Sequence, residues 1–122
     1  MNIPLNVSIN VFYKTLLTLM NKFPPIRGLR NKELEVLAEI MYQNYQNRSV
    51  TDFNKRQILI FSREGRTIMQ KRLGLKEGSF NDYLAKLRKK GVIHNNKLLP
   101  FLNIIPKDTY EFSIKFSIND EQ

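Results

Sequence analysis

The residues of this chain that could carry chemistry are mostly basic, and they gather in one segment. Between Lys55 and Lys97 the sequence holds twelve Lys and Arg residues against three acidic residues. This excess of +9 equals the formal net charge of the whole chain, so the residues outside the segment sum to zero. A localised positive charge attracts polyanions, because the phosphates that it neutralises release condensed counterions. The pattern favours the binding of nucleic acid, and the alternative is a solvated surface that keeps the chain in solution.

Residues that could catalyse a reaction or hold a metal are scarce. The chain has no cysteine and one histidine, His94, which excludes disulfide frameworks, zinc fingers and thiol catalysis. Its five glycines are isolated, and none belongs to a phosphate-binding loop. Glu35 and Glu39 lie one helical turn apart without a third ligand nearby, and we interpret them as an exposed helix face. We therefore expect no enzymatic activity, no metal site, no cofactor and no small-molecule substrate.

The basic segment contains a pattern that is typical of a helix-turn-helix. Gly74 can adopt the positive φ that a steep turn between two helices requires. Met69 and Leu73 precede it on one helical face, and Leu75 follows in the turn. The second helix should then pack inward through a stripe of apolar residues, which are Phe80, Tyr83, Leu84 and Leu87. We expect the two helices of the motif to lie within about residues 62–90.

The outward arc of the second helix supplies candidate contacts to DNA. Asn81 could pair with an adenine edge, while Lys86 and Lys89 would meet phosphates; Asp82 could accept from cytosine but repels phosphate. The candidates on this helix and at its start are Lys76, Gly78, Ser79, Asn81, Asp82, Lys86, Lys89 and Lys90. Candidates for contacts to the DNA backbone, from the preceding helix and from a hairpin after Gly91, are Arg63, Arg66, Lys71, Arg72, His94, Asn95, Asn96 and Lys97.

The order of these features resembles the winged-helix family of DNA-binding proteins, which includes phage and bacterial transcriptional regulators and plasmid-type replication initiators. The resemblance covers about Asn31 to Pro100, with Gln70 standing where a small residue is usual. It is carried by Leu73-Gly74-Leu75-Lys76-Glu77-Gly78-Ser79-Phe80 and by the later Leu84, Leu87, Arg88, Lys89, Lys90, Gly91, Val92 and Ile93. The resemblance implies a second helix laid in the major groove and a wing, at about 91–100, that touches the adjacent backbone or minor groove.

The remaining elements must position this motif. Strict alternation of apolar and polar residues predicts two terminal strands, at about 3–9 and 109–118. A first helix should follow Asn10, with a buried face formed by Phe12, Leu16, Leu19, Met20 and Phe23. A second helix should begin at Asn31, with its polar outer face formed by Lys32, Glu35, Glu39 and Gln43. A short third helix should run from Asp52 to Ile60 or Phe61.

Local signals also predict where the motif begins and ends. Ser62 should cap the first helix of the motif, and Gly91 should end the second. Asn95-Asn96 should turn a small hairpin, because asparagine tolerates positive φ. The fold that we expect is a single α+β domain over residues 1–122, mainly α with a small antiparallel β component. It is a winged helix-turn-helix with an extra N-terminal helix and terminal strands.

These expectations lead to a functional hypothesis. The chain would bind double-stranded DNA in the cytoplasm of a bacterial or phage-infected cell, as a transcriptional regulator. The alternatives are a replication initiator or accessory protein, and a structural or virion adaptor that uses the same fold to bind protein. No apolar run is long enough to span a membrane and no secretory signal is evident, so we expect no membrane partner. The C-terminal strand could pair with a second copy to form a homodimer, or helix one could cover it within a monomer.

Overall fold

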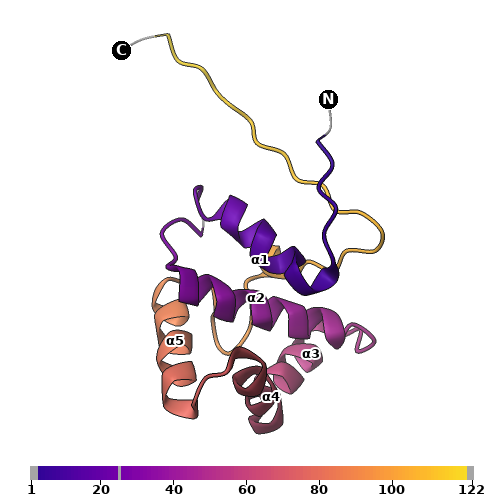
Figure 1. Cartoon of the computed structure of the whole chain (residues 1–122), viewed down its shortest axis with the longest axis vertical. Helices are drawn as coiled ribbons and strands as arrows, with labels where there is room; N and C mark the ends of the chain where they lie inside the picture. The colour runs from indigo at the N-terminus through magenta and orange to yellow at the C-terminus, as the bar shows by residue number, and fades with distance from the viewer. Residues whose placement is uncertain (1–2, 25, 121–122) are drawn as a thin grey trace.

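The computed structural model describes residues 3–24 and 26–120, and its regular elements are helices (Figure 1). They are α1 (Ile9–Met20), α2 (Asn31–Gln46), α3 (Phe53–Ile60), α4 (Arg63–Leu73) and α5 (Glu77–Lys89), followed by the short 3₁₀ helix η1 (Pro100–Leu102). Within these described residues there is no strand, and the β structure is limited to one isolated antiparallel bridge between Ile93 and Leu98. The α+β fold expected from the sequence is therefore wrong.

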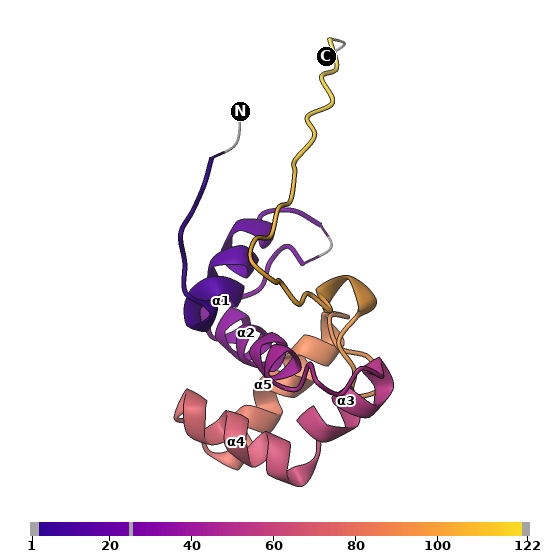
Figure 2. The same ribbon diagram turned by 90° about the vertical axis from the view of Figure 1, so that its right-hand side faces the viewer.

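Helix α2 runs through the middle of the molecule, and α1, α3, α4 and α5 all pack against it (Figure 2). Its apolar residues Val36, Leu37, Ile40 and Met41 are fully buried, as expected for a helix with neighbours on several sides. The prediction that Glu39 faces outward was wrong. Glu33 and Glu39 keep only 3% and 8% of their surface exposed, because α5 and α4 approach that side of the helix.

Side chains that accept hydrogen bonds from the first turn begin α3 and α4, and the sequence predicts the cap at Ser62. Asp52 accepts from the backbone N–H of Lys55 at 2.9 Å, and the hydroxyl of Ser62 accepts from that of Gly65 at 3.1 Å. Each bond satisfies a donor that has no partner within its own helix.

The corner between α3 and α4 depends on the absence of a side chain at Gly65. A Cβ atom built there would lie 2.2 Å from the carbonyl oxygen of Ile60 and 2.4 Å from that of Leu59. Backbone atoms cannot move aside as the tip of a side chain can. The first turn of α4 therefore rests directly on the last turn of α3, and this contact sets the direction in which α4 leaves.

A polar network holds α2, α3 and the C-terminal part of the fold together. The buried Arg56 donates from Nε to Oδ1 of Asn44 at 2.7 Å, from Nη1 to the Val50 carbonyl at 2.7 Å, and from Nη2 to Oδ1 of Asn103 at 3.0 Å. Gln57 also donates to Oδ1 of Asn44, at 2.9 Å, and accepts the backbone N–H of Leu98 at 3.1 Å. Arg56 thus stabilises the fold, although it is one of the twelve basic residues of the segment from Lys55 to Lys97.

The buried face of α1 differs from the one that the sequence predicts. Tyr13 and Leu17 are buried together with Leu16, whereas Leu19 and Phe23 remain exposed. The helix begins after Ser8 rather than Asn10 and ends at Met20, before Phe23. The face is fixed by tertiary contacts, because the Tyr13 hydroxyl donates to the Ile104 carbonyl at 2.7 Å across the core. Burial raises the pKa of this hydroxyl well above its ordinary value.

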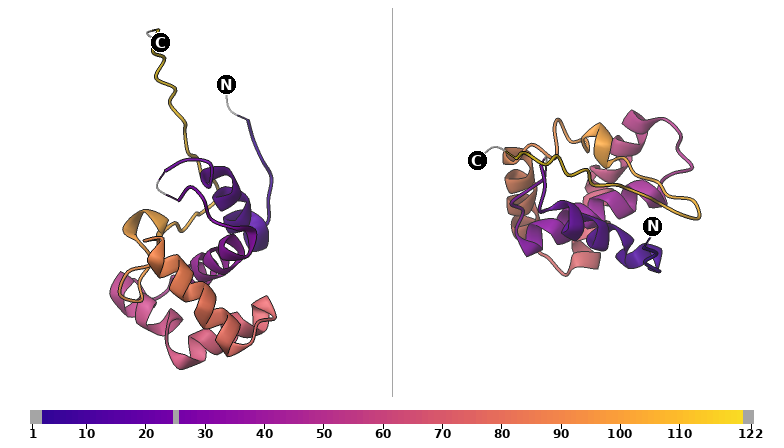
Figure 3. Two further views of the ribbon diagram at one scale, coloured as in Figure 1. Left: turned by 90° about the vertical axis from the view of Figure 1, so that its left-hand side faces the viewer. Right: turned by 90° about the horizontal axis from the view of Figure 1, so that it is seen from above.

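The prediction of two terminal strands is also wrong. Residues 3–8 and 109–118 have no strand assignment, and nearly all of their side chains are exposed. Both segments leave the helices at the side of α1, away from α4 and α5 (Figures 1 and 3). Alternation of apolar and polar residues fits one face of a sheet, but a strand forms only when a neighbour accepts its backbone hydrogen bonds.

Candidate nucleic-acid interface

Helices α4 and α5 form the helix-turn-helix that the sequence predicts. Gly74 has a left-handed backbone with φ of 66°, and its N–H points to the carbonyl oxygens of Gln70 and Lys71. On the inner side of the motif, Met69 and Phe80 are fully buried, and Leu73 and Leu75 are partly buried against the core. The turn is therefore closed by backbone hydrogen bonds and by apolar packing on its inner side.

The opposite face of α5 is open to solvent. Lys76, which precedes the helix, is exposed. The candidate DNA contacts on α5 itself are also exposed, as the sequence predicts, and they are Gly78, Ser79, Asn81, Asp82, Lys86 and Lys89. Their exposure follows from the inward stripe of Phe80, Leu84 and Leu87, which are at most 1% exposed and pack toward α2. Lys86 places its ammonium 5.1 Å from the centre of the Tyr83 ring, which keeps the cation close to the helix.

A basic groove of about 490 Å³ lies where the C-terminal half of α5 meets the start of α2. Arg30, Lys86, Lys89 and Lys90 line it together with Glu33. Arg30 immediately precedes α2, so the partly positive end of that helix adds to the charge. Arg30 is not among the residues predicted from the sequence, because it lies 56 residues before Lys86 and outside the basic segment. Only the packing of α5 on α2 brings the two cations to one groove.

Lys90, which the sequence predicts as a contact to DNA, has partners within the chain. Its ammonium donates to Oε1 of Glu33 at 2.7 Å and to the carbonyl of Gly28 at 3.0 Å. Burial alone would raise the pKa of Glu33, but hydrogen bonds from the Arg30 N–H and from Lys90 outweigh it and lower that pKa. Lys90 therefore links α5 to α2 and leaves Lys86, Lys89 and Arg30 as the available cations of the groove.

The predicted cations of α4 fall into two groups. Arg63 and Lys71 are exposed, and Arg66 is partly buried. Arg72 instead forms an ion pair with the buried Glu39, from Nε to Oε2 at 2.8 Å, and lies 4.6 Å from the centre of the Tyr42 ring. It is therefore held against α2, and its predicted contact to the DNA backbone would compete with this ion pair.

The predicted hairpin is present only as a tight turn. Asn95 and Asn96 have φ of 51° and 52°, and His94 and Lys97 exchange two backbone hydrogen bonds of 2.9 and 3.0 Å. His94, Asn95 and Asn96 are exposed and Lys97 is partly exposed, so these candidates lie at the surface. A second bridge pair does not form beyond Ile93 and Leu98 in this part of the described chain, and no sheet extends the turn into a wing.

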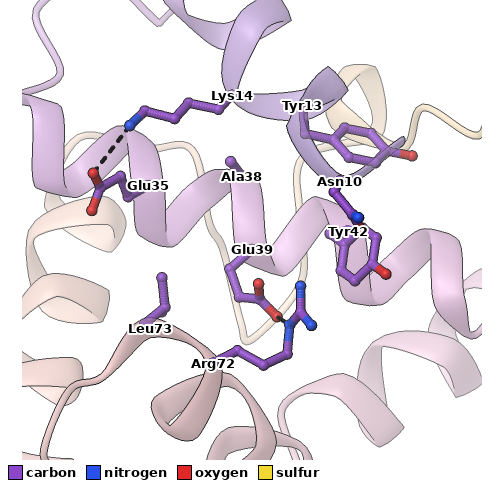
Figure 4. A pocket seen from close by; sticks show the side chains of 9 residues that line it. All are labelled: Asn10, Tyr13, Lys14, Glu35, Ala38, Glu39, Tyr42, Arg72 and Leu73. Carbon is purple, nitrogen blue, oxygen red and sulfur yellow. Dashed lines mark hydrogen bonds and ion pairs between the residues drawn. The ribbon is translucent and has the colours of Figure 1, made fainter. Parts of the chain in front are cut away.

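A second cleft, of about 250 Å³, lies between α1, α2 and the end of α4 (Figure 4). Its charged side chains already have partners, since Lys14 pairs with Glu35 at 3.1 Å and Arg72 pairs with Glu39. Hydrogen bonds from Lys32 and Lys14 lower the pKa of Glu35. The interpretation of Glu35 and Glu39 as an exposed face was thus wrong for Glu39, and both carboxylates act in packing α2 against its neighbours.

Neither a metal-binding cluster nor a membrane-spanning helix is found in the part of the chain that the structure describes. Residues 3–24 and 26–120 contain no cluster of three or more His, Cys, Asp or Glu side chains that could hold a metal ion. None of the helices formed by these residues has both the length and the apolar character needed to cross a bilayer.

The outer face of α5 and the groove beside it therefore bring the predicted cations Lys86 and Lys89 together with Arg30. Comparison with known proteins adds no assignment, since no family model, no curated protein and no solved structure matches this chain.

Proposed function

We propose that this protein binds duplex DNA by laying the outer face of α5 in the major groove. The observation that carries the proposal is the helix-turn-helix of α4 and α5, whose inner side is packed while its outer side is exposed and basic. An α helix fits the width of the major groove of B-form DNA. The tight turn at Asn95 and Asn96 follows α5 directly and projects exposed polar groups beside it.

Some residues of this face would contact base edges and select the DNA sequence, and others would contact phosphates and position the protein on the DNA. Asn81 has the amide geometry for a bidentate contact to adenine. Ser79 can donate to a phosphate oxygen, and it can donate to or accept from a base edge. Lys86, Lys89 and Arg30 would hold the phosphates that pass the C-terminal half of α5. Asp82 opposes binding at this surface, because its carboxylate repels phosphate. It can favour binding only where it accepts a hydrogen bond from a cytosine amino group.

The available positive charge is smaller than the sequence count. Of the twelve basic residues between Lys55 and Lys97, Arg56 is buried, and Arg72 and Lys90 are paired with Glu39 and Glu33. Binding should still be strongly electrostatic, with the affinity falling as salt rises at a slope of about 0.9 per phosphate contacted. In the cell we place this activity in the cytoplasm, as that of a transcriptional regulator.

Titration of a fluorescent duplex of random sequence at two salt concentrations tests the proposal. We expect binding that weakens steeply with salt, and a shallower slope for Lys86→Ala/Lys89→Ala, by about 0.9 for each phosphate that the variant no longer neutralises. Lys22→Ala/Lys107→Ala removes the same charge from exposed residues outside α4 and α5, and should keep a slope close to that of the unaltered protein. Absence of binding at low salt, or equal effects of the two double variants, would contradict the proposal.

A further inference from the structure

The C-terminal segment from Tyr110 to Ile118 carries more exposed apolar surface than a solvated tail needs. Tyr110, Phe112 and Ile114 are 40 to 48% exposed, and Phe116 and Ile118 are 82% and 88% exposed. These five residues alternate with Glu111, Ser113, Lys115 and Ser117, so an extended chain puts all of them on one face. A continuous apolar face of this kind is characteristic of a surface that contacts a partner.

The start of the segment is fixed on the helical body. The ring of Tyr110 meets the ring of Phe12 on α1 edge to face, with 5.6 Å between their centres. From there the chain extends away from α4 and α5 (Figure 3). A partner that binds along this segment would therefore leave the outer face of α5 uncovered.

The sequence of the segment is complementary to itself. In an antiparallel pair, residues directly opposite one another point to the same side, so two copies must align with apolar opposite apolar. Centring the pair on Ser113 places Tyr110 opposite Phe116, and Phe112 opposite Ile114. The same register places Glu111 opposite Lys115, and the two-fold symmetry repeats this ion pair.

We propose that the partner of this segment is a second copy of the same chain, paired antiparallel about a two-fold axis at Ser113. The ladder partner that a strand needs then comes from another molecule, which explains why one chain forms no strand here. The two apolar faces combine into one, and each glutamate faces a lysine instead of a like charge.

The neighbouring registers that keep the apolar residues aligned lack this complementarity. Centring on Ile114 places Glu111 opposite Ser117 and Lys115 opposite Ser113. Centring on Phe112 places Glu111 opposite Ser113 and Lys115 opposite Thr109. Charge therefore selects the register centred on Ser113, since register is otherwise weakly specified in an isolated ribbon.

Light scattering over a range of micromolar concentrations, together with charge reversal, tests the pairing. We expect the unaltered protein to dimerise, and Glu111→Lys or Lys115→Glu each to raise the dimer dissociation constant about tenfold, because each variant sets like charges opposite one another. An equimolar mixture of the two single variants should dimerise again, as should Glu111→Lys/Lys115→Glu, because opposite charges are restored in both. A monomeric unaltered protein overturns the proposal, and so does a dimer that the single reversals do not weaken or that the mixture does not restore.

Cross-linking gives a second readout of the same register. The chain has no cysteine, so a single substitution introduces its only thiol. Ser113→Cys places the two thiols beside the two-fold axis, within the separation that a disulfide requires, whereas Ser117→Cys separates them by several residues along the ribbon. Under the same limiting oxidant, Ser113→Cys should form the covalent dimer faster. Equal rates for the two variants would overturn the proposed axis.

Discussion

The ammonium of Lys90 lies 2.7 Å from Oε1 of Glu33 and so ties the C-terminal end of α5 to the first turn of α2. Glu33 also accepts the backbone N–H of Arg30 at 2.8 Å, which places Arg30 at the rim of the same groove. One buried carboxylate thus holds α5 in place and positions a cation beside it. The candidate interface depends on this contact even though neither partner of the pair needs to touch a ligand.

This pair should make stability depend on pH. Because folding lowers the pKa of Glu33, the carboxylate stabilises the fold above the ordinary pKa of a glutamate, and this contribution is lost as the pH falls through the lowered value. At neutral pH Glu33→Gln should lower the free energy of unfolding by about 1 to 3 kcal/mol. Urea unfolding at neutral pH and at about pH 3 should show the difference between the two proteins shrinking in acid. A constant difference would mean that the charge of Glu33 contributes nothing.

Gly65→Ala should destabilise the protein by about 2 kcal/mol or more, because the new methyl group would overlap the carbonyl oxygens of Ile60 and Leu59. Gly78→Ala is the matched control, since Gly78 also lies within a helix and a Cβ there meets no atom within 4 Å. That variant should raise stability by about 0.5 to 1 kcal/mol through helix propensity. Thermal unfolding of both variants checks the prediction, and similar effects at the two glycines would show that the α3–α4 corner can relax.

Asn44→Ala should be among the most damaging substitutions at a polar residue. It removes the acceptor shared by Arg56 and Gln57 and leaves buried donors without a partner, at a cost of about 1 to 3 kcal/mol for each. Lys55→Ala, at the exposed residue beside Arg56, should change stability by no more than about 0.5 kcal/mol. Equilibrium unfolding in urea measures both, and a near-neutral Asn44→Ala would show that water replaces the missing acceptor.

Asn81→Ala should change the preference among DNA sequences more than the overall affinity, if the proposed interface is correct. Contacts to base edges specify sequence, whereas lysine contacts to phosphate act on all sequences alike. Selection from a random duplex library, carried out with the unaltered protein and the variant, should give different preferred sites. Identical sites would remove Asn81 from base recognition, while Lys86→Ala/Lys89→Ala should weaken binding without changing the preferred site.

Features that depend only on neighbouring residues follow from local sequence. The caps at Asp52 and Ser62, the left-handed Gly74 and the paired asparagines of the turn are each set by hydrogen bonds or φ values within a few residues. This is why the limits of α3, α4 and α5 could be predicted from local pattern.

Contacts between distant parts of the chain, in contrast, set which charges remain available and which faces are buried. Arg56 and Glu39 are charged residues of types that usually lie at the surface. Their partners, Asn44 and Arg72, lie 12 and 33 residues away in the sequence, and no local pattern reveals such pairs. The face of α1 is set by the contact of Tyr13 with Ile104, across 91 residues. For residues 109–118, alternation indicates an extended chain with one apolar face, but whether it becomes a strand depends on a partner that this chain does not supply.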